Sequence, residues 1–186
     1  MAASRNKARR QSLMAAYCGM AAGLSVVIML MGGVIPAAAY AVPMLCGLML
    51  LPVLLEFGER AAWATFFSVA ALALLLDFDK EAAFFYLFVG YYPIIKWSFD
   101  KTRSRPLRVA AKLFFFTISV VIMYSLLGLV FPLEEFMQEF REMGIWMTAL
   151  LVIIYDISML LYDRMLVAAL MIYANRIRPH FRIFGK

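Results

Sequence analysis

The chain has 186 residues, of which 65% are hydrophobic and only 16% are charged. Soluble globular domains contain roughly 45–50% apolar and about 25% charged residues, so this composition excludes an ordinary water-soluble domain. The net charge of +6 does not indicate nucleic-acid binding, because the basic residues flank apolar segments and form no polar face with interleaved aromatic residues.

Six apolar segments follow one another with short loops between them. They are residues 13–34, 38–55, 61–76, 82–95, 107–131 and 145–172. Because a membrane-spanning helix needs about 20 apolar residues, the chain has room for these crossings but for no separate soluble domain. We therefore predict an all-α polytopic membrane protein, a bundle of six transmembrane helices forming a single integral membrane domain over residues 1–186.

The first segment follows a basic N-terminal stretch, residues 1–12, and in this respect resembles a secretory signal. Its length of about 22 residues exceeds the 7–15 residues of a signal core, so it is predicted to be the first transmembrane helix. Ala15, Gly19 and Gly23 recur at every fourth position and form a stripe of small residues. Such a stripe allows another helix to approach closely, either within the bundle or from a separate membrane subunit.

The lysines and arginines predict the orientation of the chain. Fifteen of the eighteen fall at alternate segment ends and loops: Arg5, Lys7, Arg9, Arg10, Arg60, Lys96, Lys101, Arg103, Arg105, Arg108, Lys112, Arg176, Arg178, Arg182 and Lys186. Only Lys80 and Arg141 fall in the other loops, and Arg164 lies within the last segment. Because cytoplasmic loops are enriched in lysine and arginine, both termini, including the basic tail 174–186, are predicted to be cytoplasmic.

The third and fourth segments are short and are expected to form a hairpin at the outer side. Asp79 is placed to cap the fourth helix, and Gly90 with Pro93 near its inner end allows a kink or a close contact. In the last outer loop, residues 133–143 alternate acidic and apolar side chains at helical spacing. We expect this stretch to lie on the outer surface.

The sixth segment carries two carboxylates, Asp156 and Asp163, seven residues apart and therefore on one helical face. Charges inside a membrane are expensive, so each is a candidate functional residue. For Asp163 we expect an ion pair with Arg164, joined by Lys112 of the fifth segment. Asp156 has no basic residue within one turn, and two alternatives stay open: contact with a substrate, or a hydrogen bond to another helix.

Aromatic residues surround the predicted outer ends of the last three segments. Most aromatic side chains of such a chain belong to the membrane-interface belts or to the core. A pocket between these ends would combine apolar walls with one anionic contact, which is typical of a small-molecule site. The predicted substrate-binding residues are Asp156, Tyr155, Trp146, Tyr124 and Tyr86.

Catalytic chemistry finds no support in the sequence. The two Tyr-Asp pairs resemble those of intramembrane aspartyl proteases, but those carboxylates share a proton, whereas Asp156 and Asp163 are about 10.5 Å apart along a helix. The chain has no His-Glu-x-x-His, Gly-x-Ser-x-Gly or nucleotide-binding glycine motif, and its single histidine, His180, lies in the tail. Cys18 and Cys46 lack metal-type spacing. We expect no enzyme, no metal and no cofactor.

In its size, its six spans of uneven length, its cytoplasmic termini and the stripe of Ala15, Gly19 and Gly23, the chain resembles the substrate-binding S-components of energy-coupling factor (ECF) transporters. In the family this docking surface has the form Ala-x-x-x-Ala. Here glycines stand in place of some of the alanines, so the side chains on the surface are still small. The stretches 79–82 and 90–93 are similar to bacterial membrane proteins grouped with that superfamily.

The resemblance implies a subunit of the bacterial inner membrane, surrounded by lipid, that binds a small nutrient from outside. A transmembrane coupling subunit and separate ATPases would be its partners and would drive uptake. The identity of the substrate does not follow. The alternative is a non-catalytic membrane scaffold subunit of a cell-envelope or cell-shape assembly, which the basic inner loops suit equally well.

Overall fold

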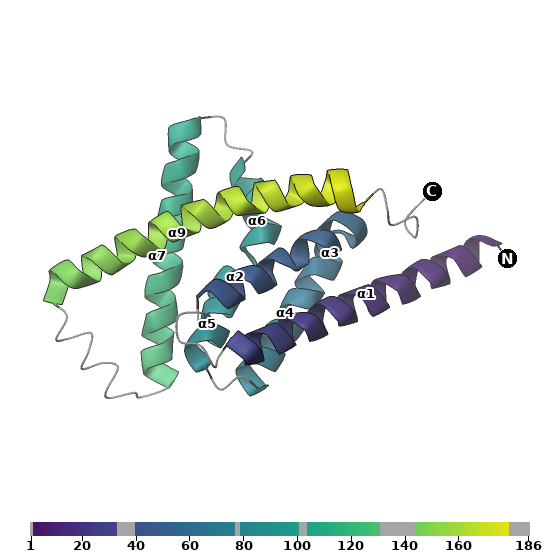
Figure 1. Ribbon diagram of the computed structural model, residues 1–186, viewed down its shortest axis with the longest axis horizontal. Helices are drawn as coiled ribbons and strands as arrows, with labels where there is room; N and C mark the ends of the chain where they lie inside the picture. Colours follow the sequence, from purple (N-terminus) through teal and green to yellow (C-terminus); the bar gives the residue numbers. More distant parts are fainter. Residues whose placement is uncertain (1, 33–39, 77–78, 101–103, 131–143, 179–186) are drawn as a thin grey trace. The chain divides into compact units, whose positions relative to one another are not determined.

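The structure, a computed structural model, describes residues 2–32, 40–76, 79–100, 104–130 and 144–178. All regular elements in these ranges are helices (Figure 1), which confirms the predicted all-α class. Three of them contain stretches long and apolar enough to cross a membrane: Ala8–Gly32 in α1 (Ala2–Gly32), α4 (Glu59–Leu76), and Arg105–Leu129 in α7 (Arg105–Val130). The six-span bundle and the cytoplasmic termini stay predictions. The expected outer segment, residues 133–143, lies outside the described residues.

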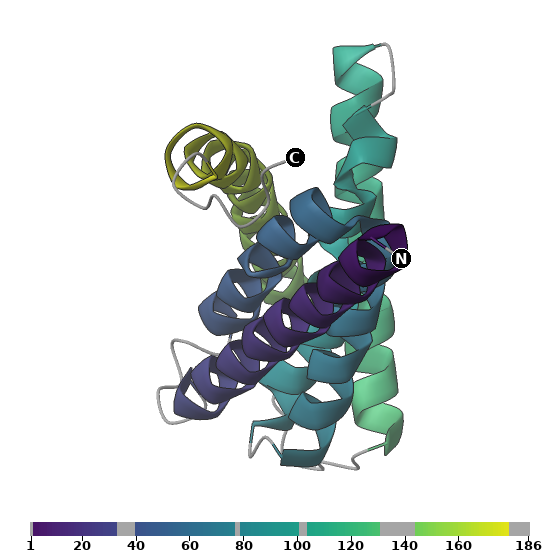
Figure 2. The ribbon, with the colours of Figure 1, turned by 90° about the vertical axis from the view of Figure 1, so that its right-hand side faces the viewer.

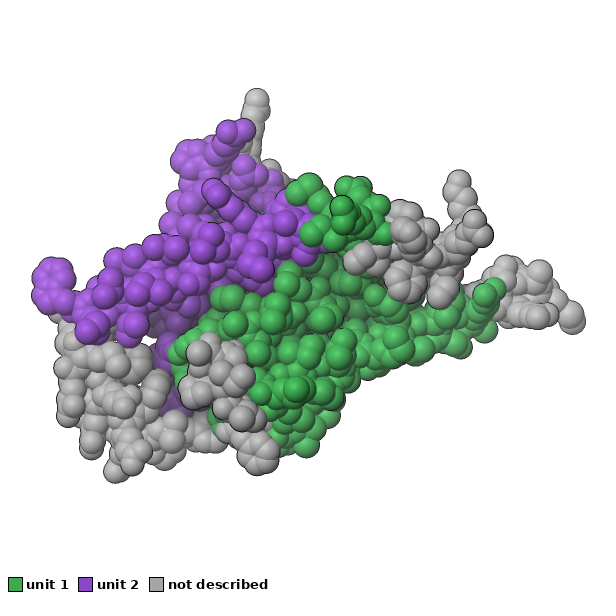
Figure 3. All heavy atoms as spheres, in the orientation of Figure 1, with its two compact units in different colours: residues 1–96, 170–186 green, residues 97–169 purple. Residues whose placement is uncertain are grey.

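The chain divides into two compact units, coloured separately in Figure 3. Unit 1 comprises Met1–Lys96 together with Leu170–Lys186, and unit 2 comprises Trp97–Ala169. The boundary near residue 170 falls inside a continuous helix, α9 (Gly144–Ile172), which is followed by the π-helical turn η2 (Tyr173–Ile177). The last helix therefore contributes to both units.

In unit 1, α4 packs against α1, α3 and α5, and α1 also contacts α2 and α3. Figures 1 and 2 both show α1 lying against α4. The buried face of α4 carries small residues, among them Ala62, Ala70 and Ala73, beside the large Phe66. Small side chains let helix backbones approach closely, which is how apolar helices pack when the surroundings are as apolar as their side chains.

Two of the predicted segments are broken, in each case four residues before a proline. The second segment divides into α2 (Ala41–Leu48) and α3 (Leu50–Phe57), and α2 ends four residues before Pro52. The fourth divides into α5 (Lys80–Val89) and α6 (Tyr92–Asp100), and α5 ends four residues before Pro93. A proline ring clashes with the carbonyl group four residues earlier and offers no N–H to bond it.

Two turns of unit 1 follow directly from local chemistry. Asp79 caps α5 as expected, because its Oδ1 accepts a hydrogen bond of 3.1 Å from the Ala82 backbone N–H. Between α3 and α4, Gly58 takes φ 86° and ψ 179°, and its N–H donates to the Leu54 carbonyl group at 3.0 Å. This backbone region is open almost only to glycine, so Gly58 permits a turn without any intervening loop.

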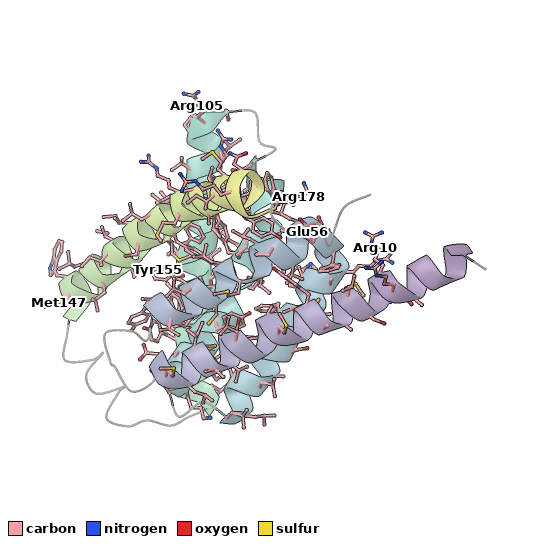
Figure 4. The ribbon with its side chains drawn as sticks, turned by 45° about the vertical axis from the view of Figure 1, so that its right-hand side comes forward. Arg10, Glu56, Arg105, Met147, Tyr155 and Arg178 are labelled. Atoms are coloured by element: carbon pink, nitrogen blue, oxygen red, sulfur yellow. The ribbon has the colours of Figure 1, made fainter. Side chains whose placement is uncertain are left out.

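A polar cluster joins three distant parts of unit 1. Arg178 Nε lies 3.0 Å from Glu56 Oε1, and Figure 4 shows the two residues together. The Glu56 side chain is only 4% exposed, whereas Arg178 is 58% exposed. Tyr17 of α1 and Tyr173 of η2 share a side-chain hydrogen bond beside Glu56. The middle of α1, the end of α3 and the end of the last helix therefore meet at one place.

The turn at Gly58 yields a first prediction. Gly58→Ala should lower the free energy of unfolding by about 1–3 kcal/mol, because alanine is strained at this φ and ψ. Steric clash plays no part, since a Cβ at Gly58 would meet no atom within 4 Å. Unfolding in mixed SDS and mild-detergent micelles measures the change.

Gly19→Ala is the matched control. A Cβ at Gly19 also meets nothing within 4 Å, but this glycine lies within α1. Alanine is the better helix former, so this variant should gain about 0.5–1 kcal/mol. Equal effects of the two substitutions would contradict the assignment of strain to Gly58.

Candidate functional site

The charged centre of unit 2 is Lys112, which bridges two carboxylates. Lys112 Nζ donates to Asp100 Oδ1 at 2.8 Å and to Asp163 Oδ2 at 2.9 Å, and the lysine side chain is 5% exposed. The expected partnership between Asp163 and Lys112 is confirmed, while Arg164 is exposed to the surroundings. Asp100, at the end of α6, was not predicted as a partner.

This bridge ties α6, α7 and α9 together. The Phe99 and Phe115 rings, with centroids 5.3 Å apart, add an apolar contact between α6 and α7 next to it. Burying an ammonium group is costly unless anions and hydrogen bonds compensate for its lost hydration. The two carboxylates supply that compensation from either side of α7.

Asp156 has a different environment. Thr117 Oγ1 donates to Asp156 Oδ2 at 3.1 Å, so the interhelical hydrogen bond that was one of the two alternatives is present. The second oxygen, Oδ1, is buried, and no hydrogen-bond partner for it exists among the residues that the structure describes. The carboxylate is therefore oriented by a neutral hydroxyl group and keeps one acceptor atom for another partner.

The two contacts fix how α7 and α9 run past each other. From Lys112 to Thr117 the chain advances about 7.5 Å along α7, while from Asp163 to Asp156 it runs back about 10.5 Å along α9. The two helices touch through these two contacts, and Figure 1 shows α9 crossing α7 at a steep angle. Their contact at this place is made by polar side chains.

The predicted aromatic site residues differ in their exposure and belong to different units. Tyr155, labelled in Figure 4, precedes Asp156 on α9 and is half-buried, as is Tyr124 on α7. Trp146, near the start of α9, is 88% exposed. Tyr86 is a core residue of unit 1, fully buried with its ring 5.4 Å from that of Phe66. Its hydroxyl group finds no partner within the described ranges.

The small-residue stripe lies on an open face of α1. Ala15, Gly19 and Gly23 are all exposed, and a Cβ added at either glycine would meet no atom within 4 Å. The described helices that pack on α1 contact residues such as Ala22, Val26 and Met29, which are buried. The stripe therefore takes no part in the core of unit 1.

The cysteines behave as packing residues. Cys46 is buried and its thiol group donates to the Ser25 carbonyl oxygen at 3.3 Å, while Cys18 packs at the edge of the same core. Within the described ranges, no three His, Cys, Asp or Glu side chains gather as a metal site would require. Nothing in this part of the chain offers a coordination sphere.

Comparison with protein-family models found no match, and comparisons with curated proteins and with solved structures found no similar protein or fold. The candidate site is therefore argued from the geometry of this chain alone.

Lys112 yields the second prediction. Lys112→Met should lower the free energy of unfolding by about 3–5 kcal/mol, because it leaves two carboxylates without their cation. Adding Asp163→Asn should recover part of the loss by removing one of those charges. Chemical unfolding of the three proteins in mixed micelles measures both effects.

The control is Arg164→Met, which removes an exposed cation adjacent to Asp163. It should change stability by no more than about 0.5 kcal/mol. A loss as large as that of Lys112→Met would show that Arg164, and not Lys112, neutralises Asp163.

Proposed function

We propose that the chain is a membrane-embedded, substrate-binding subunit of the S-component kind. It binds a small nutrient from outside the cell, and separate ATPases drive uptake through a transmembrane coupling subunit. The chain supplies binding and docking surfaces and performs no chemistry of its own. It lies in the inner membrane of a bacterium, with both termini in the cytoplasm.

The open stripe on α1 is the observation that carries this proposal. Membrane helices associate by close packing between small residues, because burial from water supplies no driving force inside a bilayer. Ala15, Gly19 and Gly23 offer such a surface, and no described helix of the chain occupies it. A second membrane subunit is the partner whose surface chemistry matches an open, apolar helix face of this kind.

The polar cluster of unit 1 supports the proposed topology. Both chain ends can share one side of the membrane only if the first, second and last spans have ends on that side. The contacts of Tyr17 and Glu56 with Tyr173 and Arg178 join α1 and α3 to the end of the last helix, which agrees with this arrangement. The orientation then follows from the excess of lysine and arginine at these ends.

In the proposed cycle, the ligand-binding state and the partner-bound state compete. A ligand shifts a conformational equilibrium only by its difference in affinity between the two states. The nutrient must therefore bind the outward state more tightly, and docking of the coupling subunit must favour the inward one. The ATPases provide the free energy that resets the cycle.

The third prediction tests docking. Purification of the tagged chain from its native membrane should yield an ATPase-bearing complex, and Gly19→Leu should abolish that association. The leucine side chain prevents the partner's helix from packing closely against α1. The fold of the chain itself stays intact, because a Cβ at this position meets no atom within 4 Å. Quantitative mass spectrometry of the purified complexes measures the loss.

Ala64→Leu is the matched control, since Ala64 is exposed on α4, away from the stripe. It should leave the association unchanged. Equal association of wild type and Gly19→Leu with the ATPase-bearing complex would contradict the proposal that this face of α1 is the docking surface. Cell-wall enzymes in place of ATPases in the wild-type complex would favour the scaffold function.

A further inference from the structure

Two carboxylates occupy one face of α9, and their surroundings differ in kind. Asp163 meets the ammonium group of Lys112 at 2.9 Å. Asp156 meets the hydroxyl group of Thr117 at 3.1 Å, and its Oδ1 is buried without a hydrogen-bond partner in the described chain. Within the described residues, one carboxylate is thus neutralised by a cation and the other is not.

The described cations of unit 2 lie too far along their helices to reach Asp156. They are Arg105, Arg108, Lys112 and Arg164. Lys112 precedes Thr117 by about 7.5 Å along α7, and Arg164 follows Asp156 by about 12 Å along α9. Lys112 is also engaged by both of its carboxylates. The partner of Asp156 Oδ1 therefore does not come from this part of the chain.

A neutral hydroxyl group offsets only part of the cost of a buried carboxylate. An unsatisfied buried acceptor retains its desolvation penalty, and charge-assisted hydrogen bonds are the ones that compensate most strongly. A charged N–H donor satisfies both requirements, because it brings the opposite charge together with a directed hydrogen bond. An anionic group at the same place would add repulsion to desolvation.

We propose that Asp156 Oδ1 binds a protonated nitrogen of the transported molecule, such as an amine, an amidine or a protonated heterocycle. Thr117 is a positioning residue, which holds the other carboxylate oxygen so that Oδ1 is presented to the ligand. This assignment rests on the proposed function and adds to it the chemical class of the nutrient: a small compound with a net positive charge.

The test separates nutrients by charge. An extract of complex growth medium is divided by ion exchange at pH 7 into cationic, anionic and neutral fractions. The purified wild-type protein is then melted with each fraction, since a ligand that binds only the folded state raises the melting temperature. The cationic fraction should raise it. The active compound is purified from that fraction by following the same shift.

The variants then locate the contact. Asp156→Asn should raise the half-saturating concentration of the purified compound by about tenfold or more, because a hydrogen bond to a charged group is lost. Thr117→Val should cause a smaller increase, and Thr117→Ser should restore wild-type affinity because it returns the hydroxyl group. Equal affinity of wild type and Asp156→Asn would overturn the assignment.

The measurement on the wild-type protein tests the charge of the ligand separately from nutrient binding itself, and it does so even where a variant does not fold. Stabilisation by the anionic or the neutral fraction alone would overturn the cationic ligand while supporting a nutrient-binding subunit. Absence of stabilisation by every fraction would contradict the proposed function itself.

Discussion

Placing charge inside an apolar chain is the constraint on which the structure depends. With 65% hydrophobic residues, there are few groups that can compensate for a buried charge, and the described charges are arranged accordingly. Lys112 is shared between Asp100 and Asp163, and Glu56 is matched by Arg178. Each bridge connects different helices, because a single helix cannot surround a charge with partners. The charge pairs therefore specify which helices of a unit lie together.

Asp156 departs from this pattern, and this departure is the basis of the proposed ligand contact. A fold that pairs its other described membrane carboxylate with a cation gains nothing in stability by leaving this one with a hydroxyl group. Polar groups within predicted membrane segments more often serve binding or transport. The proposed ligand site and the proposed docking stripe lie in different units, Asp156 in unit 2 and Gly19 in unit 1.

The sequence predicts the limits of α7 and α9 well because their signal is local, whereas α1 begins at Ala2, ahead of the predicted residue 13. The expected limits 107–131 and 145–172 match α7 and α9 to within two residues, and the Asp79 cap follows from its position before a helix. The break between α2 and α3 has a sequence signal, because Pro52 cannot donate a hydrogen bond to the carbonyl group four residues earlier. Judging the segment by its hydrophobicity alone hides that signal. The organisation of the chain as a single membrane domain is still a prediction.

Partners that depend on tertiary packing could not be predicted in this way. Asp100 joins Lys112 only because α6 turns back along α7, and Arg178 reaches Glu56 only after the whole chain has folded. Neither pair has a sequence spacing that marks it. The same limit applies to Tyr86, whose place in the core of unit 1 follows from the packing of α5 and not from its aromatic neighbours in sequence.

The central claim is that the chain threads the membrane with its basic loops inside. Labelling of single cysteines in intact cells with a membrane-impermeant maleimide tests it, after Cys18 and Cys46 are replaced by alanine. A cysteine at Lys80 should react and one at Arg60 should react only after the cells are lysed, because the two positions are predicted to lie on opposite sides of the membrane. Reaction at Arg60 in intact cells, with Lys80 protected, would contradict the account.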